Sequence, residues 1–250
     1  MDLLLSKILG YLNGSLQDDV NYQFCKFIIN NYLELEDMSF DDVINQSGIG
    51  KEEILGFCNL LGFSSYEQFV AKLIRDHFIR LDQIRARMLG LDSDELINKI
   101  EIATVNAKIK EYITMICEAI FKAKRIIFIG ALYPLSIAVE LQTDLINLGK
   151  VVLQYHEYDQ DLVLDENDVT IFISATGRSM NSFMKIKKEL AVEKTTSILI
   201  TQNKIYTLGE YKLANYVIQI PGKFDGIDFN YQIRIICDII RVYYYQKYFL

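Results

Sequence analysis

Short, uniformly apolar segments recur through the second half of the chain, with helix-like stretches between them. They lie at 125–130, 151–155, 168–174, 196–201 and 216–220. A strand whose sheet is covered by helices on both faces needs apolar residues on both of its sides, so runs of this kind indicate a parallel sheet. The stretches 134–149 and 179–193 carry apolar residues at helical spacing. The sequence therefore predicts an α/β fold built on five parallel strands.

The first ninety residues follow a different pattern, with apolar residues three and four positions apart and no strand signal. Ser39 is placed to cap a helix that Gly48 ends. The next segment puts four residues on one apolar face: Ile54, Phe57, Leu60 and Leu61. A break follows around Gly90. We therefore predict a helical domain over 1–90, a linker helix over 91–105 and the α/β domain over 106–250.

Composition excludes several classes of protein. The four cysteines are far apart without a C-x-x-C pair and the two histidines are isolated, so we expect free thiols in a reducing cytoplasm and no metal or other cofactor. The longest nearly uncharged run, 126–139, has 14 residues, and a membrane span needs about 20. The N-terminus "MDLLLSKILG" shows no secretory signal. We expect a soluble cytoplasmic protein with no membrane partner.

A hydroxyl-rich segment, "ISATGRSMN" at 173–181, ends the third predicted strand. Three hydroxyl side chains, Ser174, Thr176 and Ser179, surround Gly177, which permits a positive φ and a close approach to a ligand. The following helix offers free N–H groups and a positive dipole end, and Arg178 adds a charge. An ordinary helix cap is the alternative reading. Three neutral donors without a carboxylate favour a phosphate monoester.

The segment Ser174-Ala175-Thr176-Gly177-Arg178-Ser179 is similar to the S-x-S-G-x-T phosphosugar loop of sugar isomerase (SIS) domains, with two conservative changes. The earlier loop of such domains usually reads G-x-G-x-S. Here it keeps Gly130 but has Leu132 and Pro134 at the second glycine and the serine. The segments "ILITQN" and "LANYVIQIP" also resemble SIS domains. The resemblance implies a phosphorylated sugar held by the 174–179 loop and Gly130, with half of the usual cradle altered.

The order of the two parts resembles RpiR-type (MurR/RpiR) transcription regulators, in which an all-α helix-turn-helix domain precedes an α/β/α SIS domain. The segment "LLGFSSYEQF" carries this likeness in the first part. The resemblance implies a helix-turn-helix from about Ser39 to Phe63. Its reading helix, 51–61, would meet DNA through Lys51, Glu52, Glu53 and Asn59. It also implies a homodimer, matching a palindromic operator, or a higher homo-oligomer, whose affinity for DNA changes when the sugar phosphate binds.

The charge of the first part argues against strong DNA binding. Residues 1–80 hold six Lys or Arg and twelve Asp or Glu, whereas affinity for duplex DNA comes largely from basic groups that neutralise phosphates. The family's usual capping Ser, Thr and Arg are replaced by Gly50, Glu53 and Gly56. An SIS-domain protein with weakened or lost DNA binding therefore stays as the alternative.

A phosphosugar isomerase is a further alternative, because SIS domains also occur in such enzymes. An aldose–ketose shift needs a positioned base, and Glu140 and His156 are the candidates. A helix-surface position for Glu140 and a loop position for His156 explain them more simply. We therefore expect a protein without catalytic activity.

The last predicted helix carries an apolar stripe at helical spacing, Phe229, Ile233, Ile236, Ile240 and Tyr244. Core packing explains such a stripe, and it could also form a seam with a second copy of the chain.

Overall fold

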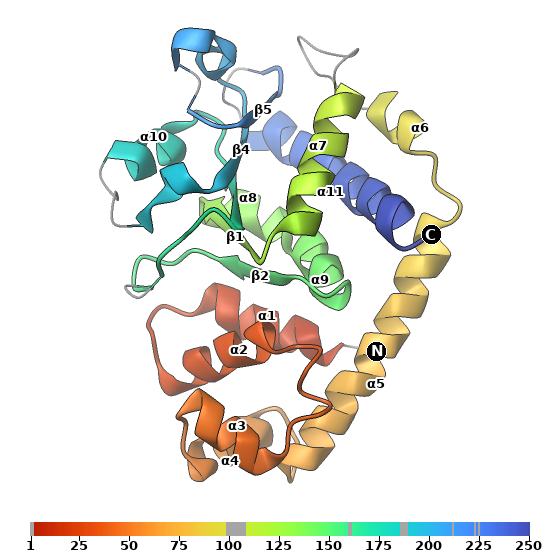
Figure 1. The fold of residues 1–250 in the computed structure, drawn as a ribbon, viewed down its shortest axis with the longest axis vertical. Helices are drawn as coiled ribbons and strands as arrows, with labels where there is room; N and C mark the ends of the chain where they lie inside the picture. The colour runs from red at the N-terminus through yellow and green to blue at the C-terminus, as the bar shows by residue number, and fades with distance from the viewer. Residues whose placement is uncertain are drawn as a thin grey trace. The chain divides into compact units, whose positions relative to one another are not determined.

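The computed structural model describes residues 3–98, 109–159, 162–185, 190–211, 213–222, 224 and 226–250. The chain divides into two compact units (Figure 1). The first contains residues up to Ala86 together with Thr143–Val151, and the second contains Arg87–Gln142 and Val152–Leu250. Part of the linker helix predicted over 91–105 lies outside the described residues, and Ser93–Asn98 forms helix α6 of the second unit.

The described residues of the first unit's N-terminal part form helices and no strands, as the sequence predicts. These are α1 (Leu4–Gly14), α2 (Val20–Asn30), α3 (Phe40–Ser47), α4 (Lys51–Leu60) and α5 (Tyr66–Met88), whose end lies in the second unit. The predicted cap and stop of α3 are confirmed. The amide of Asp42 donates to Ser39 Oγ at 3.1 Å, that of Ser39 donates to Asp42 Oδ2 at 3.0 Å, and Gly48 has φ +70°.

Aromatic side chains fill the core of the first unit. The ring of Phe24 meets that of Phe57 edge-on at 5.4 Å, and Phe69 lies 6.4 Å from Phe57. Such pairs add about 0.5–1.5 kcal/mol beyond the area they bury. On α4, Ile54 and Phe57 are buried as predicted, but Leu60 is 65% exposed, so the predicted apolar face is wrong at that residue.

A buried ion pair holds the segment 143–151 within the first unit. Arg80 of α5 donates from Nε to Asp144 Oδ1 at 2.8 Å and pairs with the same carboxylate through Nη2. Next to it, Asn147 Oδ1 lies 3.1 Å from His77 Nδ1. Since both side chains of the ion pair are almost fully buried, their charges depend on each other.

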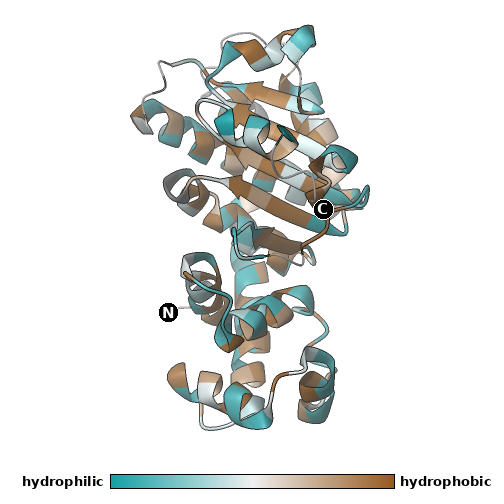
Figure 2. Ribbon diagram, turned by 90° about the vertical axis from the view of Figure 1, so that its left-hand side faces the viewer, coloured by the Kyte–Doolittle hydropathy of each residue, from teal (hydrophilic) through white to brown (hydrophobic). Residues whose placement is uncertain are grey.

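The second unit contains the predicted five-stranded parallel sheet. Its strands are β1 (Arg125–Gly130), β2 (Val151–Gln154), β3 (Asp168–Ile173), β4 (Thr196–Thr201) and β5 (Tyr216–Gln219), in the order β2-β1-β3-β4-β5. Every residue of β3 is buried, and Figure 2 shows the strands as the most hydrophobic elements. This confirms the prediction from the uniformly apolar runs.

Helices accompany the strands. Besides α6 they are α7 (Ile109–Lys122), α8 (Leu132–Ile137), α9 (Val139–Asn147), α10 (Arg178–Lys185) and α11 (Gly226–Tyr248), with 3₁₀ turns η2 (Val192–Lys194), η3 (Lys204–Thr207) and η4 (Gly209–Tyr211). The single helix predicted over 134–149 is therefore two. They separate at Ala138, whose amide donates to Leu135 O, three residues back, at 3.0 Å.

The apolar stripe of α11 belongs to the core of the second unit. All five of its residues are at most 1% exposed, and α11 packs against α7, where Cys117 Sγ lies 3.7 Å from Ile240 O. Packing within the unit thus accounts for the stripe, and it is not available as a seam. The four cysteines are buried free thiols, as expected.

Candidate functional site

The first element of the candidate site is the point where β1 and β3 end side by side. Gly130 is the register partner of Ile173. A Cβ added to Gly130 would lie 2.5 Å from Ile173 O, closer than side-chain atoms approach a carbonyl. Glycine at this position therefore lets the loops after both strands start next to each other, at the carboxyl edge where parallel sheets bind ligands.

The hydroxyl-rich segment forms a tight turn after β3. The amide of Ser174 donates to Ile200 O of β4 at 3.0 Å, and the amide of Gly177 donates back to Ser174 O at 3.0 Å. Gly177 has φ +73°, the left-handed conformation that the sequence predicted for it. Helix α10 begins at the next residue, so its first N–H groups lie beside the turn.

Residues after β4 hold this turn in place. Thr201 Oγ1 and the amide of Gln202 donate to Ala175 O at 3.0 and 2.9 Å, and Asn203 Nδ2 donates to Thr176 O at 3.0 Å. The carbonyls of the turn thus accept hydrogen bonds within the protein. Sequence reasoning missed Thr201 and Asn203, because nothing in their local pattern links them to a turn that follows another strand.

Two side chains of the turn, and one that packs on it from η3, lie in different settings. Arg178 is exposed, and its Nε donates to Thr176 Oγ1 at 3.2 Å, which keeps its guanidinium beside the turn. Ser179 Oγ is buried, and no group in the described part of the chain hydrogen-bonds to it. Tyr206 of η3 is buried and packs against Gly177 so closely that a Cβ there would overlap its ring. The sequence offered no signal for Tyr206.

The loop after β1 is a poorer source of donors. Pro134 lies in the first turn of α8, where backbone N–H groups have no intrahelical partner, so the helix tolerates a proline. The same residue removes an N–H group that a ligand could use. The turn at 174–179 is therefore the better candidate for binding an anion.

Residues 119–224 match the family model of the SIS domain. These residues therefore form an SIS domain. No curated protein matches the chain. The match includes the whole sheet together with both loops described above, so the altered first loop and the 174–179 turn are features of an SIS domain.

Several solved structures are similar to the chain. Vibrio vulnificus NanR complexed with ManNAc-6P has 12% identity and a TM-score of 0.47, with 96% of this chain and 92% of that chain covered. A Methanococcus jannaschii protein, whose structure infers 3-hexulose-6-phosphate isomerase function, has 20% identity and a TM-score of 0.49, with 68% of this chain and 92% of that chain covered. The sugar isomerase domain of an RpiR transcription factor from Sphaerobacter thermophilus has 16% identity and a TM-score of 0.44, with 66% of this chain and 89% of that chain covered. Regulators and an inferred isomerase both occur among them.

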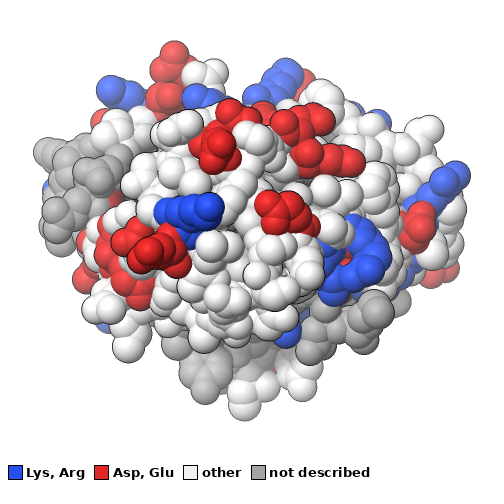
Figure 3. All heavy atoms as spheres, turned by 90° about the horizontal axis from the view of Figure 1, so that it is seen from below, with Lys and Arg blue, Asp and Glu red and all other residues white. Residues whose placement is uncertain are grey.

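The residues predicted to meet DNA lie on α4 of the first unit. Lys51, Glu52 and Asn59 are exposed. Glu53 is exposed too, but its Oε2 accepts the amide of Gly50 at 2.7 Å and so caps the start of α4. Figure 3, viewed from the side on which α3 and α4 lie, shows acidic clusters between the basic ones.

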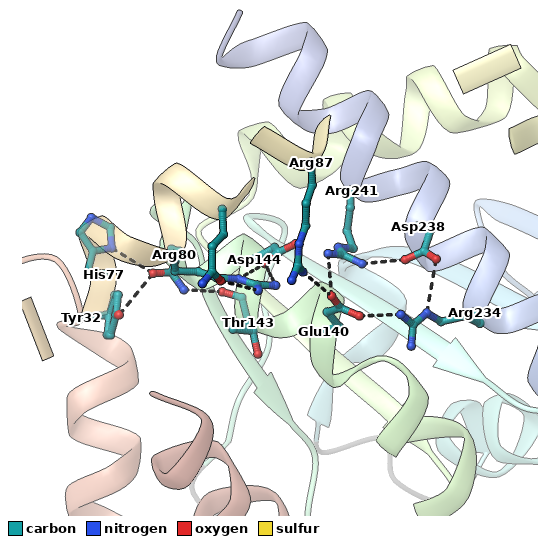
Figure 4. A network of polar contacts seen from close by, with 12 residues as sticks. Tyr32, His77, Arg80, Arg87, Glu140, Thr143, Asp144, Arg234, Asp238 and Arg241 are labelled. Atoms are coloured by element: carbon teal, nitrogen blue, oxygen red, sulfur yellow. Dashed lines mark hydrogen bonds and ion pairs between the residues drawn. The ribbon is translucent and has the colours of Figure 1, made fainter. Parts of the chain in front are cut away.

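Glu140, one candidate base of an isomerase, is bound by three arginines of the second unit (Figure 4). Its carboxylate lies 3.3 Å from Arg87 Nη1, 2.7 Å from Arg234 Nη2 and 3.0 Å from Arg241 Nη2. Glu140 was expected at a helix surface. That expectation describes its surroundings only in part, because one of its partners, Arg241, is buried. The carboxylate of Glu140 is therefore engaged in ion pairs with three guanidinium groups.

His156, the other candidate base, lies in the loop after β2 as expected. Its ring stacks on Tyr158 with centroids 5.0 Å apart, and its amide donates to Asp159 Oδ2 at 3.1 Å. Among the described residues, no three His, Cys, Asp or Glu side chains are grouped to hold a metal ion. Within the same residues, no helix has the length and apolar character that a membrane span requires.

Proposed function

We propose that the SIS domain binds a phosphorylated sugar at the turn from Ser174 to Ser179. The observation that carries this proposal is the Ser179 hydroxyl, which is buried in the first turn of α10 with no hydrogen-bond partner among the described residues. A buried polar group left unpaired costs about 1–3 kcal/mol. A phosphate oxygen would remove that cost while also accepting from the free N–H groups of α10.

The charge of the turn supports a phosphate rather than a neutral sugar alone. The segment 173–181 contains no Asp or Glu, and the guanidinium of Arg178 is held beside the turn by Thr176. Guanidinium groups bind phosphate through charge-assisted hydrogen bonds. The ligand would also lie near Gly130, which lets the loop after β1 start beside this turn.

The ligand proposal is tested by thermal unfolding with a panel of hexose and amino-sugar phosphates. The unmodified protein should be stabilised by the right compound, and the variant carrying Ser174→Ala and Thr176→Ala should not. Equal stabilisation of both proteins would remove the turn from the binding site.

We also propose that the chain regulates transcription by binding DNA through α4. Helices α3 and α4 are joined by three residues that include the left-handed Gly48, a connection typical of helix-turn-helix units. Lys51, Glu52 and Asn59 would face the DNA, whereas Glu53 caps the helix. A homodimer would match a palindromic operator. Ligand binding would then favour one conformation and change operator affinity.

The alternative, an SIS-domain sensor with weakened or lost DNA binding, is favoured by the use of basic groups inside the first unit. Lys72 pairs with Asp76, and Arg80 pairs with Asp144. These pairs leave fewer cations for DNA phosphates in a segment already rich in acid.

A mobility-shift assay on the DNA upstream of the gene, at several salt concentrations, separates the two readings. Regulation predicts weak binding that falls steeply with salt, is lost in Lys51→Ala and changes when the sugar phosphate is added. Binding that is absent even at low salt would favour the sensor without DNA. We do not propose isomerase activity, because the arginines around Glu140 oppose its use as a base.

A further inference from the structure

A polar cavity lies in the second unit, between α7 and α11. It has a volume of about 430 Å³ and is lined by Lys110 and Thr114 of α7 and by Tyr243, Gln246 and Lys247 of α11. We call it the α7–α11 cavity. It shares no residue with the turn at 174–179, which lies on other elements of the fold.

The lining of the α7–α11 cavity is suited to an anion. Two of its five residues are lysines, two carry hydroxyls and none is acidic. The lysines come from different helices, Lys110 from α7 and Lys247 from α11, and Lys247 Nζ also lies 5.2 Å from the centroid of the Tyr248 ring. Lysine is a point-charge donor for phosphate, and each charge-assisted hydrogen bond is roughly twice as strong as a neutral one.

The two hydroxyls form a defined pair. Thr114 Oγ1 donates to Lys110 O at 2.7 Å and lies 3.0 Å from Tyr243 Oη. Because the threonine has one proton and gives it to the carbonyl, the proton of Tyr243 either bonds to Thr114 or turns toward a ligand. The pair can therefore serve the hydroxyls of an organic ligand as donor or acceptor.

The size of the cavity argues for an organic molecule rather than a bare ion. Pockets that hold small organic ligands measure about 300–1,000 Å³, and this cavity falls in that range.

Gln246 connects the cavity to the end of helix α5. Its Nε2 donates to Met88 O at 3.1 Å and to Leu91 O at 2.9 Å, so it caps the end of α5 from the cavity wall.

We propose that the α7–α11 cavity binds a small organic phosphate, and that this ligand contacts the side chain that caps α5. The site goes beyond the proposed sugar-phosphate turn. It would allow a second metabolite to act on the helix end that Gln246 holds.

Isothermal titration with glucose 6-phosphate as the probe, at fixed ionic strength, tests this site. The titrated protein carries Ser174→Ala and Thr176→Ala, so that binding at the turn does not contribute. Binding should persist in this protein, and it should weaken about tenfold or more in Lys110→Gln and in Lys247→Gln, the loss of one charge-assisted contact. Lys124→Gln is the matched control, since Lys124 is an exposed lysine outside the cavity.

Three results would overturn the proposal. One is the absence of binding in the Ser174→Ala and Thr176→Ala protein. That result would rule out the cavity, but it would not affect the proposal that the turn binds a phosphorylated sugar. Another is equal affinity in the two lysine variants and the control. The third is equally tight binding of glucose or of inorganic phosphate, because either would show that the cavity does not recognise an organic phosphate.

Discussion

The ring of Tyr206 packs directly on Gly177, at the one point of the 174–179 turn where the backbone has a positive φ. Two independent constraints therefore require glycine there. The conformation is costly for any residue with a Cβ, and the ring occupies the space in which a Cβ would lie.

Replacement of Gly177 by alanine should lower the free energy of unfolding by about 2 kcal/mol or more, since the left-handed conformation alone costs about 1–2 kcal/mol and the ring must also move. Chemical denaturation measures the change. Gly209→Ala is the control, because Gly209 has no positive φ and no atom near the position of its Cβ. A Gly177→Ala protein as stable as the control would show that the turn is not held in this conformation.

The buried pair of Arg80 and Asp144 should behave as a unit. Either Arg80→Met or Asp144→Leu alone should destabilise the first unit by about 3 kcal/mol or more, because each removes the opposite charge that a buried charge pairs with. The double variant should recover most of the loss. Denaturant unfolding of the three proteins gives the coupling free energy. Losses that simply add would mean that the two charges do not depend on each other.

Glu140 should be structural. Glu140→Gln should destabilise the second unit by about 1–3 kcal/mol, because the buried Arg241 loses an acidic partner, Glu140, and keeps Asp238. Glu118→Gln, which breaks an exposed pair with Lys122, should change stability little. Unchanged stability together with the loss of a measured aldose–ketose isomerisation would instead identify Glu140 as a catalytic base.

The cap of α3 should make that helix sensitive to acid. The hydrogen bonds from the side chain and then the amide of Ser39 hold the pKa of Asp42 below its ordinary value of 3.8. Because the folded pKa is lowered, the stabilisation is fully present above about pH 4 and is lost as the pH falls through the folded pKa. A carboxyl NMR titration should show the pKa of Asp42 rising toward its ordinary value in Ser39→Ala. An unchanged pKa would mean that the capping box does not form.

The parts of the fold that follow from local pattern were predictable. The five strands follow from apolar runs, since a strand buried on both faces carries mostly apolar residues on both of its sides, and the ends of α3 follow from Ser39 and Gly48. The break at Ala138 and the exposure of Leu60 were not, because each depends on how neighbouring elements pack.

The candidate site was predictable only in the turn that one segment forms. Thr201, Asn203 and Tyr206 reach that turn from another part of the chain, and the arginines around Glu140 come from three distant positions. Contacts of this kind depend on tertiary structure, and a single sequence without its fold does not reveal them.

The most direct test of the phosphate-binding turn compares two serines of the SIS domain whose hydroxyls differ in their hydrogen bonds. Ser179 Oγ has no partner among the described residues, whereas Ser197 Oγ lies 3.0 Å from Asn215 Oδ1 and accepts the amide of Asn215 at 3.3 Å. Affinity for the stabilising sugar phosphate and the free energy of unfolding are measured for Ser179→Ala and Ser197→Ala. The account predicts that Ser179→Ala keeps its stability and loses about tenfold in affinity, while Ser197→Ala loses about 1 kcal/mol of stability and keeps its affinity. Undiminished affinity in Ser179→Ala would contradict it.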